Sequence, residues 1–239
     1  MFALYKKELQ SYFLSPIAYF VIAFFMATFS LTFIQDIGNV SSSTYTFSFP
    51  SIFYVNIFYF IFLLPLLTMR TFSEERKNGT ETLLLSSPLN VTQIVMAKFL
   101  ATATILLMML VVSLFYPILT SIYGRVIWSS LICTYIGFFL FGLVCIALGI
   151  FISSLTENQV VAAVVGMIVL LALALIDVVA RYAESVPVVP TVLNALSFYT
   201  RYYDFTAGLF DPASVLFYVS TAVIFNFFTV RVFEKRRWS

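Results

Sequence analysis

The sequence predicts an all-α integral membrane protein with six transmembrane helices. Composition is the first reason, because 62% of the 239 residues are hydrophobic and 10% are charged, whereas soluble domains carry roughly 25% charged residues. The length of the apolar segments is the second reason, because six of them are each long enough to cross ~30 Å of hydrocarbon at 1.5 Å per residue. The mean hydropathy of +1.01 agrees. We therefore interpret residues 1–239 as one transmembrane domain.

Residues 1–14 predict a helix that lies at the membrane interface. Its apolar side chains share one helical face: Phe2, Tyr5, Leu9, Tyr12 and Phe13. Polar side chains, Lys7 among them, fall on the opposite face. The apolar run that follows is longer than the core of a signal peptide and lacks a small-residue cleavage site, so it is expected to stay as the first span. Ser15 is placed to cap that span, with Pro16 at its first helical position.

The predicted spans cover about residues 16–34, 51–69, 94–119, 128–152, 159–178 and 212–231. Pro65 and Pro117 are expected to kink the second and third of them. In the fourth, small residues recur every three or four positions: Gly142, Cys145, Gly149 and Ser153. Such a face lets another helix approach closely. We expect it to pack within the bundle rather than to line a path.

Basic residues predict the orientation of the spans, because Lys and Arg are enriched in cytoplasmic loops. Six spans place both termini on one side. That side would hold ten basic residues: Lys6, Lys7, Arg70, Arg76, Lys77, Lys98, Arg231, Lys235, Arg236 and Arg237. The other side would hold Arg125, Arg181 and Arg201. The prediction is a multi-pass membrane protein with both termini in the cytoplasm.

A long polar segment, residues 70–93, separates the second span from the third. Its first part, Arg70 to Lys77, alternates in charge and predicts a solvated helical turn or two, which Asn78-Gly79 would end. Thr80 is placed to cap a second short helix from Glu81 to Leu85. Pro88 would end that helix, and Asn90 with Gln93 resembles a capping box for the next span. A tight turn would be enough to connect two spans, so a polar segment of this length suggests that it contacts a partner protein.

Two further connections carry expectations. Thr156 with Gln159 predicts a capping box at the start of the fifth span, after a tight inner loop. Residues 179–210 contain two prolines and an aromatic cluster, which predicts an external segment at the membrane interface. A lid over an exit path and packing against the outer leaflet or a partner subunit both fit this segment. The aromatic cluster consists of Phe198, Tyr199, Tyr202, Tyr203 and Phe205.

Three stretches together resemble the ABC-2 type transporter permeases. The first is a motif in the polar segment: Arg70, Phe72, Glu74, Glu75, Arg76, Gly79, Thr80 and Leu83 to Leu85, followed by Pro88 and Lys98. One departure is that Glu81 follows Thr80 directly, where many members place the acid one residue later. The other stretches are residues 151–159 and 232–238. The likeness covers the whole chain and is closest to the small gliding-motility-associated permeases.

This resemblance implies a type V exporter-like fold in which residues 70–93 form the cytoplasmic coupling loop, with a coupling helix that contacts an ATPase. It implies coupling roles for twelve residues: Arg70, Glu74, Glu75, Arg76, Gly79, Thr80, Glu81, Leu83, Leu84, Pro88, Glu157 and Asn158. The partners that it implies are an ABC ATPase subunit and an auxiliary membrane subunit with an external domain. A second, identical permease chain is also expected, because one six-span bundle leaves little room for a path. No nucleic-acid partner is expected.

The sequence itself offers no catalytic chemistry. It contains no His, and no metal-ligand cluster is recognisable. None of the eight glycines begins a Gly-x-x-x-x-Gly-Lys-Ser/Thr loop, which is the loop that cradles nucleotide phosphates. We therefore expect no catalytic or metal site and no cofactor bound by this chain, with ATP and magnesium held by the partner ATPase.

The expected function is that of a permease subunit that exports a hydrophobic or amphipathic cargo with ATP hydrolysed by another subunit. An ATP-independent carrier or channel is one alternative, and it would predict charged residues or broken helices at mid-membrane. A membrane anchor or assembly subunit that moves nothing is the other. A neighbouring ATPase gene would disfavour the carrier, and a transport assay would disfavour the anchor.

Overall fold

The structure is a computed structural model that describes residues 1–38, 46–47, 49–123, 125–182 and 197–237. Its helices are α1 (Phe2–Leu14), α2 (Pro16–Gly38), α3 (Phe49–Thr68), α4 (Arg70–Lys77), α5 (Glu81–Leu85), α6 (Val91–Ser113), α7 (Phe115–Tyr123), α8 (Trp128–Leu155), α9 (Gln159–Tyr182), α11 (Phe198–Thr206) and α12 (Pro212–Arg237). Two two-residue strands, β1 (Thr46–Phe47) and β2 (Arg125–Val126), pair in parallel.

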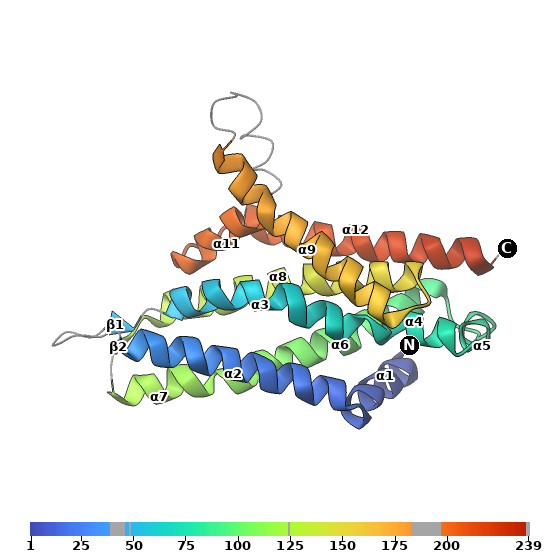
Figure 1. Cartoon of the computed structure of the whole chain (residues 1–239), viewed down its shortest axis with the longest axis horizontal. Coiled ribbons are helices and arrows are strands. Elements are labelled where there is room, and N and C mark those ends of the chain that lie inside the picture. The colour runs from blue at the N-terminus through green and yellow to red at the C-terminus, as the bar shows by residue number, and fades with distance from the viewer. Residues whose placement is uncertain (39–45, 48, 124, 183–196, 238–239) are drawn as a thin grey trace.

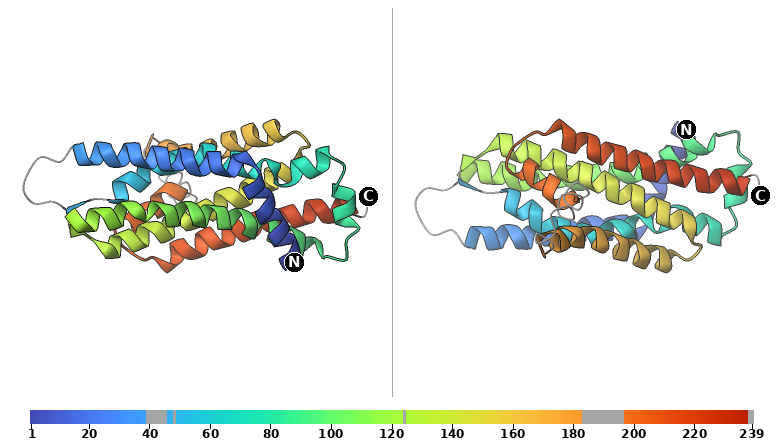
Figure 2. Two further views of the ribbon diagram at one scale, coloured as in Figure 1. Left: turned by 90° about the horizontal axis from the view of Figure 1, so that it is seen from below. Right: turned by 90° about the horizontal axis from the view of Figure 1, so that it is seen from above.

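Six helical segments of the described chain are long and apolar enough to cross a membrane, as the sequence predicts. They are α2, α3 with α4, α6 with α7, α8, α9 and α12. Figure 1 shows both termini and α5 at the same end of the bundle. In Figure 2, α1 lies across that end, against α6. Figure 1 also shows α9 diverging from the other helices toward its C-terminal end.

Helix α8 is the centre of the bundle and packs against α3, α6, α9, α11 and α12. Its small residues make this possible. A Cβ at Gly142 would lie 2.5 Å from Leu106 on α6, and one at Gly149 would lie 2.2 Å from Thr68 on α3. The prediction that this face packs within the bundle is therefore confirmed.

Phenylalanine rings fill the middle of the bundle. Phe138 of α8 lies 4.2 Å from Phe60 and 5.0 Å from Phe53, both on α3, and 6.1 Å from Phe25 on α2, measured between ring centroids. All four side chains are fully buried. Each such aromatic pair adds about 0.5–1.5 kcal/mol to the contribution of its buried area.

The two intramembrane prolines have different effects. The helix of the third span breaks at Leu114, so that α6 ends at Ser113 and α7 begins at Phe115. Pro117 lies in the first turn of α7, where a missing N–H is tolerated, and it has no N–H to donate to the carbonyl of Ser113. By contrast, α3 continues through Pro65 as one helix.

Helix α11 packs one face into the bundle, whereas the sequence places residues 179–210 at the membrane interface. Phe198, Tyr202 and Phe205 are buried. The hydroxyl of Tyr218 on α12 donates to the carbonyl of Phe198 at 2.6 Å. Gly137 on α8 leaves the space that the Phe205 ring fills. Residues 183–196 of the same segment lie outside the described residues.

Candidate functional site

Hydrogen bonds to Ser153 on α8 hold helix α4 against the bundle. The Ser153 hydroxyl accepts hydrogen bonds from the backbone N–H groups of Phe72 (3.1 Å) and Ser73 (3.2 Å). It also donates to the carbonyl of Met69 at 3.0 Å. One side chain thereby binds the backbone of the turn that joins α3 to α4. The end of α3 and the start of α4 are held together on α8.

The buried face of α4 corrects the prediction of a solvated helix. Thr71, Phe72 and Ser73 are buried, and the Phe72 ring packs against Phe233 of α12 with 4.4 Å between centroids. The physical reason is that α4 continues almost directly from α3. Only Met69 separates α4 from α3, so one face of α4 stays over the bundle while the other meets solvent.

A buried lysine joins three helices at this position. Lys98 of α6 is 1% exposed, and its ammonium donates at 2.9 Å to Glu8 of α1, to Glu75 of α4 and to the carbonyl of Thr71. All three of its protons are therefore used. The second oxygen of the Glu75 carboxylate is buried and has no hydrogen-bond partner among the described residues. Sequence reasoning named Lys98 in the family motif and Glu75 among the coupling residues, but it predicted neither their contact nor the part of Glu8. The signal was Lys98 itself, the one charged residue within the predicted span 94–119.

Tyr12 of α1 completes the contact between α1 and the bundle. Its hydroxyl is hydrogen-bonded to Thr102 at 3.0 Å and to Thr71 at 3.3 Å. Burial raises the pKa of the Tyr12 phenol above its ordinary value, so the group stays protonated at neutral pH. The apolar face predicted for residues 1–14 thus packs largely on protein, although Phe2 remains 76% exposed.

Arg70 forms a bidentate ion pair with Glu74, one turn along α4. The two N–O distances are 2.6 Å and 2.8 Å, and the same guanidinium donates to Ser15 at 2.6 Å. Ser15 lies between α1 and α2, where its hydroxyl also accepts from the N–H of Ile17. Arg70, paired with Glu74, therefore holds α4 beside the α1–α2 junction. Both residues are among the twelve with predicted coupling roles.

A network of four charged residues joins α4 and α5 to two distant segments. Arg76 contacts Glu157 of the α8–α9 loop at 2.8 Å and Glu81 of α5 at 4.0 Å. Arg236 of α12 contacts Glu81 at 3.1 Å and donates to the carbonyl of Ser154 at 2.7 Å. Sequence reasoning predicted three of the four as site residues. It counted Arg236 among the cytoplasmic basic residues and in the stretch 232–238, but gave it no coupling role.

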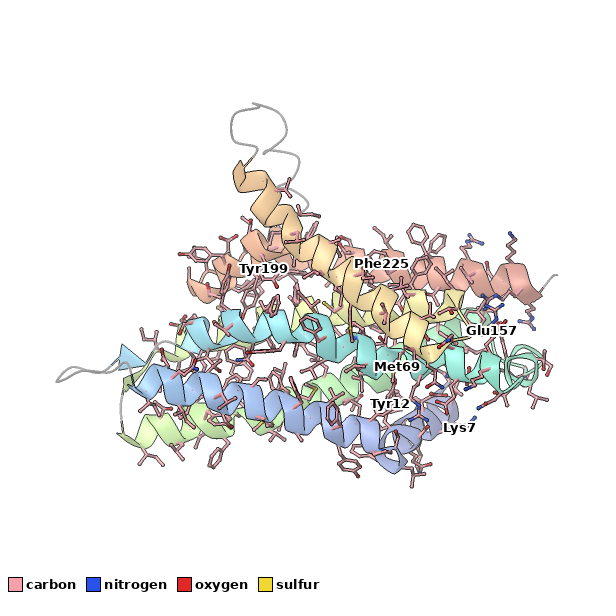
Figure 3. The ribbon with its side chains drawn as sticks, in the orientation of Figure 1. Lys7, Tyr12, Met69, Glu157, Tyr199 and Phe225 are labelled. Carbon is pink, nitrogen blue, oxygen red and sulfur yellow. The ribbon has the colours of Figure 1, made fainter. Side chains whose placement is uncertain are left out.

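Helix α5 extends beyond the ion pairs and hydrogen bonds that hold α4. Gly79 has φ +69°, the left-handed conformation that ends α4 as predicted. Leu83 is 72% exposed, whereas Leu84 packs partly against the core. Pro88 is exposed in the segment that follows. Figure 3 shows Lys7, Tyr12, Met69 and Glu157 at the same end of the molecule.

Two capping predictions are wrong. The Thr80 side chain does not cap α5 but donates to the carbonyl of Glu75 at 3.2 Å. Its backbone has φ −82° and ψ −7°, whereas a capping side chain usually needs an extended backbone. At α9 the cap is Asn158, whose side-chain oxygen accepts from the N–H of Val160 at 2.9 Å. Thr156 instead accepts from the N–H of Asn158.

A groove of about 600 Å³ runs between α1 and the segment α4–α5. Its lining includes Lys7 and Glu8 from α1, Glu75 from α4 and Leu83 from α5. The twelve predicted coupling residues therefore differ in their surroundings. Five charged residues of α4 and α5 form the ion pairs described above, and Leu84 packs partly against the core. The other six are exposed: Gly79, Thr80, Leu83, Pro88, Glu157 and Asn158. Within the described ranges, no group of three or more His, Cys, Asp or Glu side chains could hold a metal ion.

The family model for ABC-2 family transporter proteins matches residues 34–228. The chain belongs to the ABC-2 transporter family. Members are generally non-catalytic transport subunits, and membership implies an ABC ATPase partner. The match contains α4, α5 and the α8–α9 loop, but not Glu8 or Arg236, which the structure adds to the site. No curated protein matches the chain.

Proposed function

We propose that this chain is the membrane-spanning permease subunit of an ABC transporter and that a separate ATPase docks on its coupling surface. We define the coupling surface as α4, α5 and the loop 156–158. The exposed Leu83 on α5 carries this proposal, because it projects from a segment that Lys98 and Ser153 bind to the bundle. An apolar side chain of this kind suits a groove on a partner protein.

The same contacts support mechanical transmission. ATP and magnesium would be held by the ATPase subunits, and their closure would move α5. Arg76 and Glu81 connect α5 to the α8–α9 loop and to α12, and α4 continues directly into α3. Because binding shifts a conformational balance only through contacts that differ between states, some contacts of the coupling surface must change on closure.

The path for cargo is proposed to lie between two identical permease chains. Within one chain, the fully buried rings of Phe25, Phe53, Phe60 and Phe138 occupy the centre of the bundle. The apolar surfaces of the spans suit a hydrophobic or amphipathic cargo better than an ion. Export is the direction that the family resemblance implies.

The membrane is proposed to be the bacterial cytoplasmic membrane, with both termini and the coupling surface in the cytoplasm. The basic residues of the two terminal segments and the α3–α6 connection support this orientation. The gliding-motility-associated likeness further suggests an auxiliary membrane subunit with an external domain.

Co-purification with a co-expressed candidate ABC ATPase tests the proposal. Leu83→Asp places a charge in the docking contact, so we expect the ATPase to be lost and its stimulated turnover to fall at least tenfold. Leu209→Asp is the matched control, because Leu209 is 63% exposed in the turn before α12, at the other end of that helix from the coupling surface. Equal recovery of the ATPase with both variants would contradict the proposal.

A further inference from the structure

The backbone stays helical between α3 and α4, but its hydrogen bonds are interrupted there. Met69, the residue between the two helices, has φ −55° and ψ −31°, which are ordinary helical values. In a continuous helix the N–H groups of Phe72 and Ser73 would donate to the carbonyls of Thr68 and Met69, four positions earlier. Neither bond is present among the backbone hydrogen bonds of the described residues. The boundary between α3 and α4 is therefore a gap in hydrogen bonding along a helical backbone.

The local sequence does not explain this gap. Residues 66–74 contain neither Gly nor Pro, and these are the residues at which helices most often bend. Pro65 lies one turn earlier, where its missing N–H affects only the bond to the carbonyl of Ile61. The carbonyl of Pro65 itself accepts from the N–H of Met69 at 2.8 Å, so the helix is intact up to that residue. The cause of the gap therefore lies in a contact with another helix.

Ser153 of α8 makes that contact. Its hydroxyl accepts from the N–H groups of Phe72 and Ser73 and donates to the carbonyl of Met69. A serine hydroxyl has one proton to donate and two lone pairs that accept, so its hydrogen-bonding capacity is fully used. Ser153 is also 1% exposed. A side chain that inserts in this way between the N–H and C=O groups of a helix is a recognised cause of helix bending.

Closing the gap would give the same groups a second set of partners. The carbonyl of Thr68 accepts no hydrogen bond from any described residue, so it is available to an N–H of α4. In the closed arrangement the two N–H groups would donate to Thr68 and Met69, and the hydroxyl of Ser153 would donate to the carbonyl of Gly149 in its own helix. That arrangement has as many hydrogen bonds as the observed one. Neither arrangement leaves one of these donors unpaired.

We propose that Ser153 is a positioning residue for the coupling surface, because its hydroxyl holds this gap open and so sets the direction in which α4 carries α5 and Leu83. Displacement of α5 exchanges the hydroxyl for the carbonyls of Thr68 and Met69, and α4 swings about Met69 as the gap closes. The eight residues of α4 span ~12 Å, so a change in bend of ~20° moves the far end of α4 by ~4 Å. This inference rests on the proposed docking of an ATPase at α5.

Ser154 provides a matched control. It is the neighbour of Ser153 on α8, and both residues are 1% exposed. Among the described residues, the Ser154 hydroxyl bonds only to the carbonyl of Phe151 in its own helix, at 2.6 Å. Ser153→Ala and Ser154→Ala therefore remove the same atom from the same kind of site, and only the first removes a contact with the α3–α4 boundary.

Nuclear magnetic resonance of the full chain in nanodiscs tests the exchange of partners. Threonine carbonyls are labelled with ¹³C and methionine amides with ¹⁵N, which isolates the Thr68 carbonyl because Thr68-Met69 is the only Thr-Met step in the sequence. In Ser153→Ala we expect this carbonyl resonance to move downfield, because the carbonyl then accepts from the N–H of Phe72 and a hydrogen bond deshields the carbonyl carbon. Ser154→Ala should leave the resonance in place.

Two results would overturn the inference. One is a Thr68 resonance that does not move in Ser153→Ala. The other is failure of Ser153→Ala to fold when Ser154→Ala folds, because the N–H groups of Phe72 and Ser73 would then have no second set of acceptors.

The same variants, co-purified with the ABC ATPase, test the effect on coupling. Ser153→Ala keeps Leu83 and should still capture the ATPase, but we expect stimulated turnover to fall roughly tenfold or more, because misplacements of about 1 Å far from the chemistry can cost as much. Ser154→Ala should match the wild type. Equal turnover in both variants would overturn the positioning role. Failure of the wild type to capture the ATPase would instead contradict the proposed function, and the Thr68 resonance would still decide whether the gap closes.

Discussion

Replacing Lys98 with Met is expected to lower the free energy of unfolding by ~3–5 kcal/mol, the typical cost of removing one partner from a buried ion pair. The reason is the environment of Lys98, which is 1% exposed and forms ion pairs with both Glu8 and Glu75. Met fills a similar volume but leaves two carboxylates, whose side chains are only 14% and 17% exposed, without a cation. Denaturant unfolding of the purified protein in mixed micelles measures the change.

Two controls separate charge from packing. Adding Glu8→Gln and Glu75→Gln to Lys98→Met removes the uncompensated charges and should recover much of the lost stability. Lys77→Met, at an exposed position of α4, should change the free energy of unfolding by ~0.5 kcal/mol or less. Equal effects of Lys98→Met and Lys77→Met would show that the buried ion pairs contribute little.

Gly149→Ala is expected to destabilise the bundle by ~1–3 kcal/mol through overpacking. The added Cβ would lie 2.2 Å from the Thr68 hydroxyl oxygen and 3.0 Å from its Cβ. Thr68 has little freedom to move away, because it is 1% exposed and its hydroxyl donates to the carbonyl of Leu64 at 2.9 Å. The unfolding midpoint of α8 variants in detergent measures the loss.

The double variant Gly149→Ala with Thr68→Ala tests the steric origin. Removing the Thr68 hydroxyl and methyl relieves the closest contact, so the combined loss should be smaller than the sum of the two single losses. If the two single losses in stability simply added, the Gly149→Ala loss would not come from the contact with the Thr68 side chain.

Local patterns in the sequence predicted much of the fold. The six spans follow from runs of apolar residues. The end of α4 at Asn78-Gly79 needs only a residue that tolerates positive φ. The start of α6 depends on Asn90 and Gln93, which form the expected capping box. Each of these features depends on residues within a few positions of one another.

Contacts between residues that are distant in the sequence could not be predicted from such local patterns. The partners of Lys98 come from α1 and α4, and Arg236 meets Glu81 across 155 positions of sequence. Composition could not show which face of α4 or α11 would be buried, because that depends on the helices beside them. At α9, Thr156 and Asn158 are both suitable caps two residues apart. The backbone geometry of the loop selects between them.

Site-specific photo-cross-linking in membranes tests the docking claim most directly. A photoreactive residue at Leu83 should cross-link to the co-expressed ABC ATPase, and the same residue at Leu209 should not. A cross-link from position 209, or none from position 83 while the complex still co-purifies, would place the ATPase elsewhere and contradict the assignment of α5.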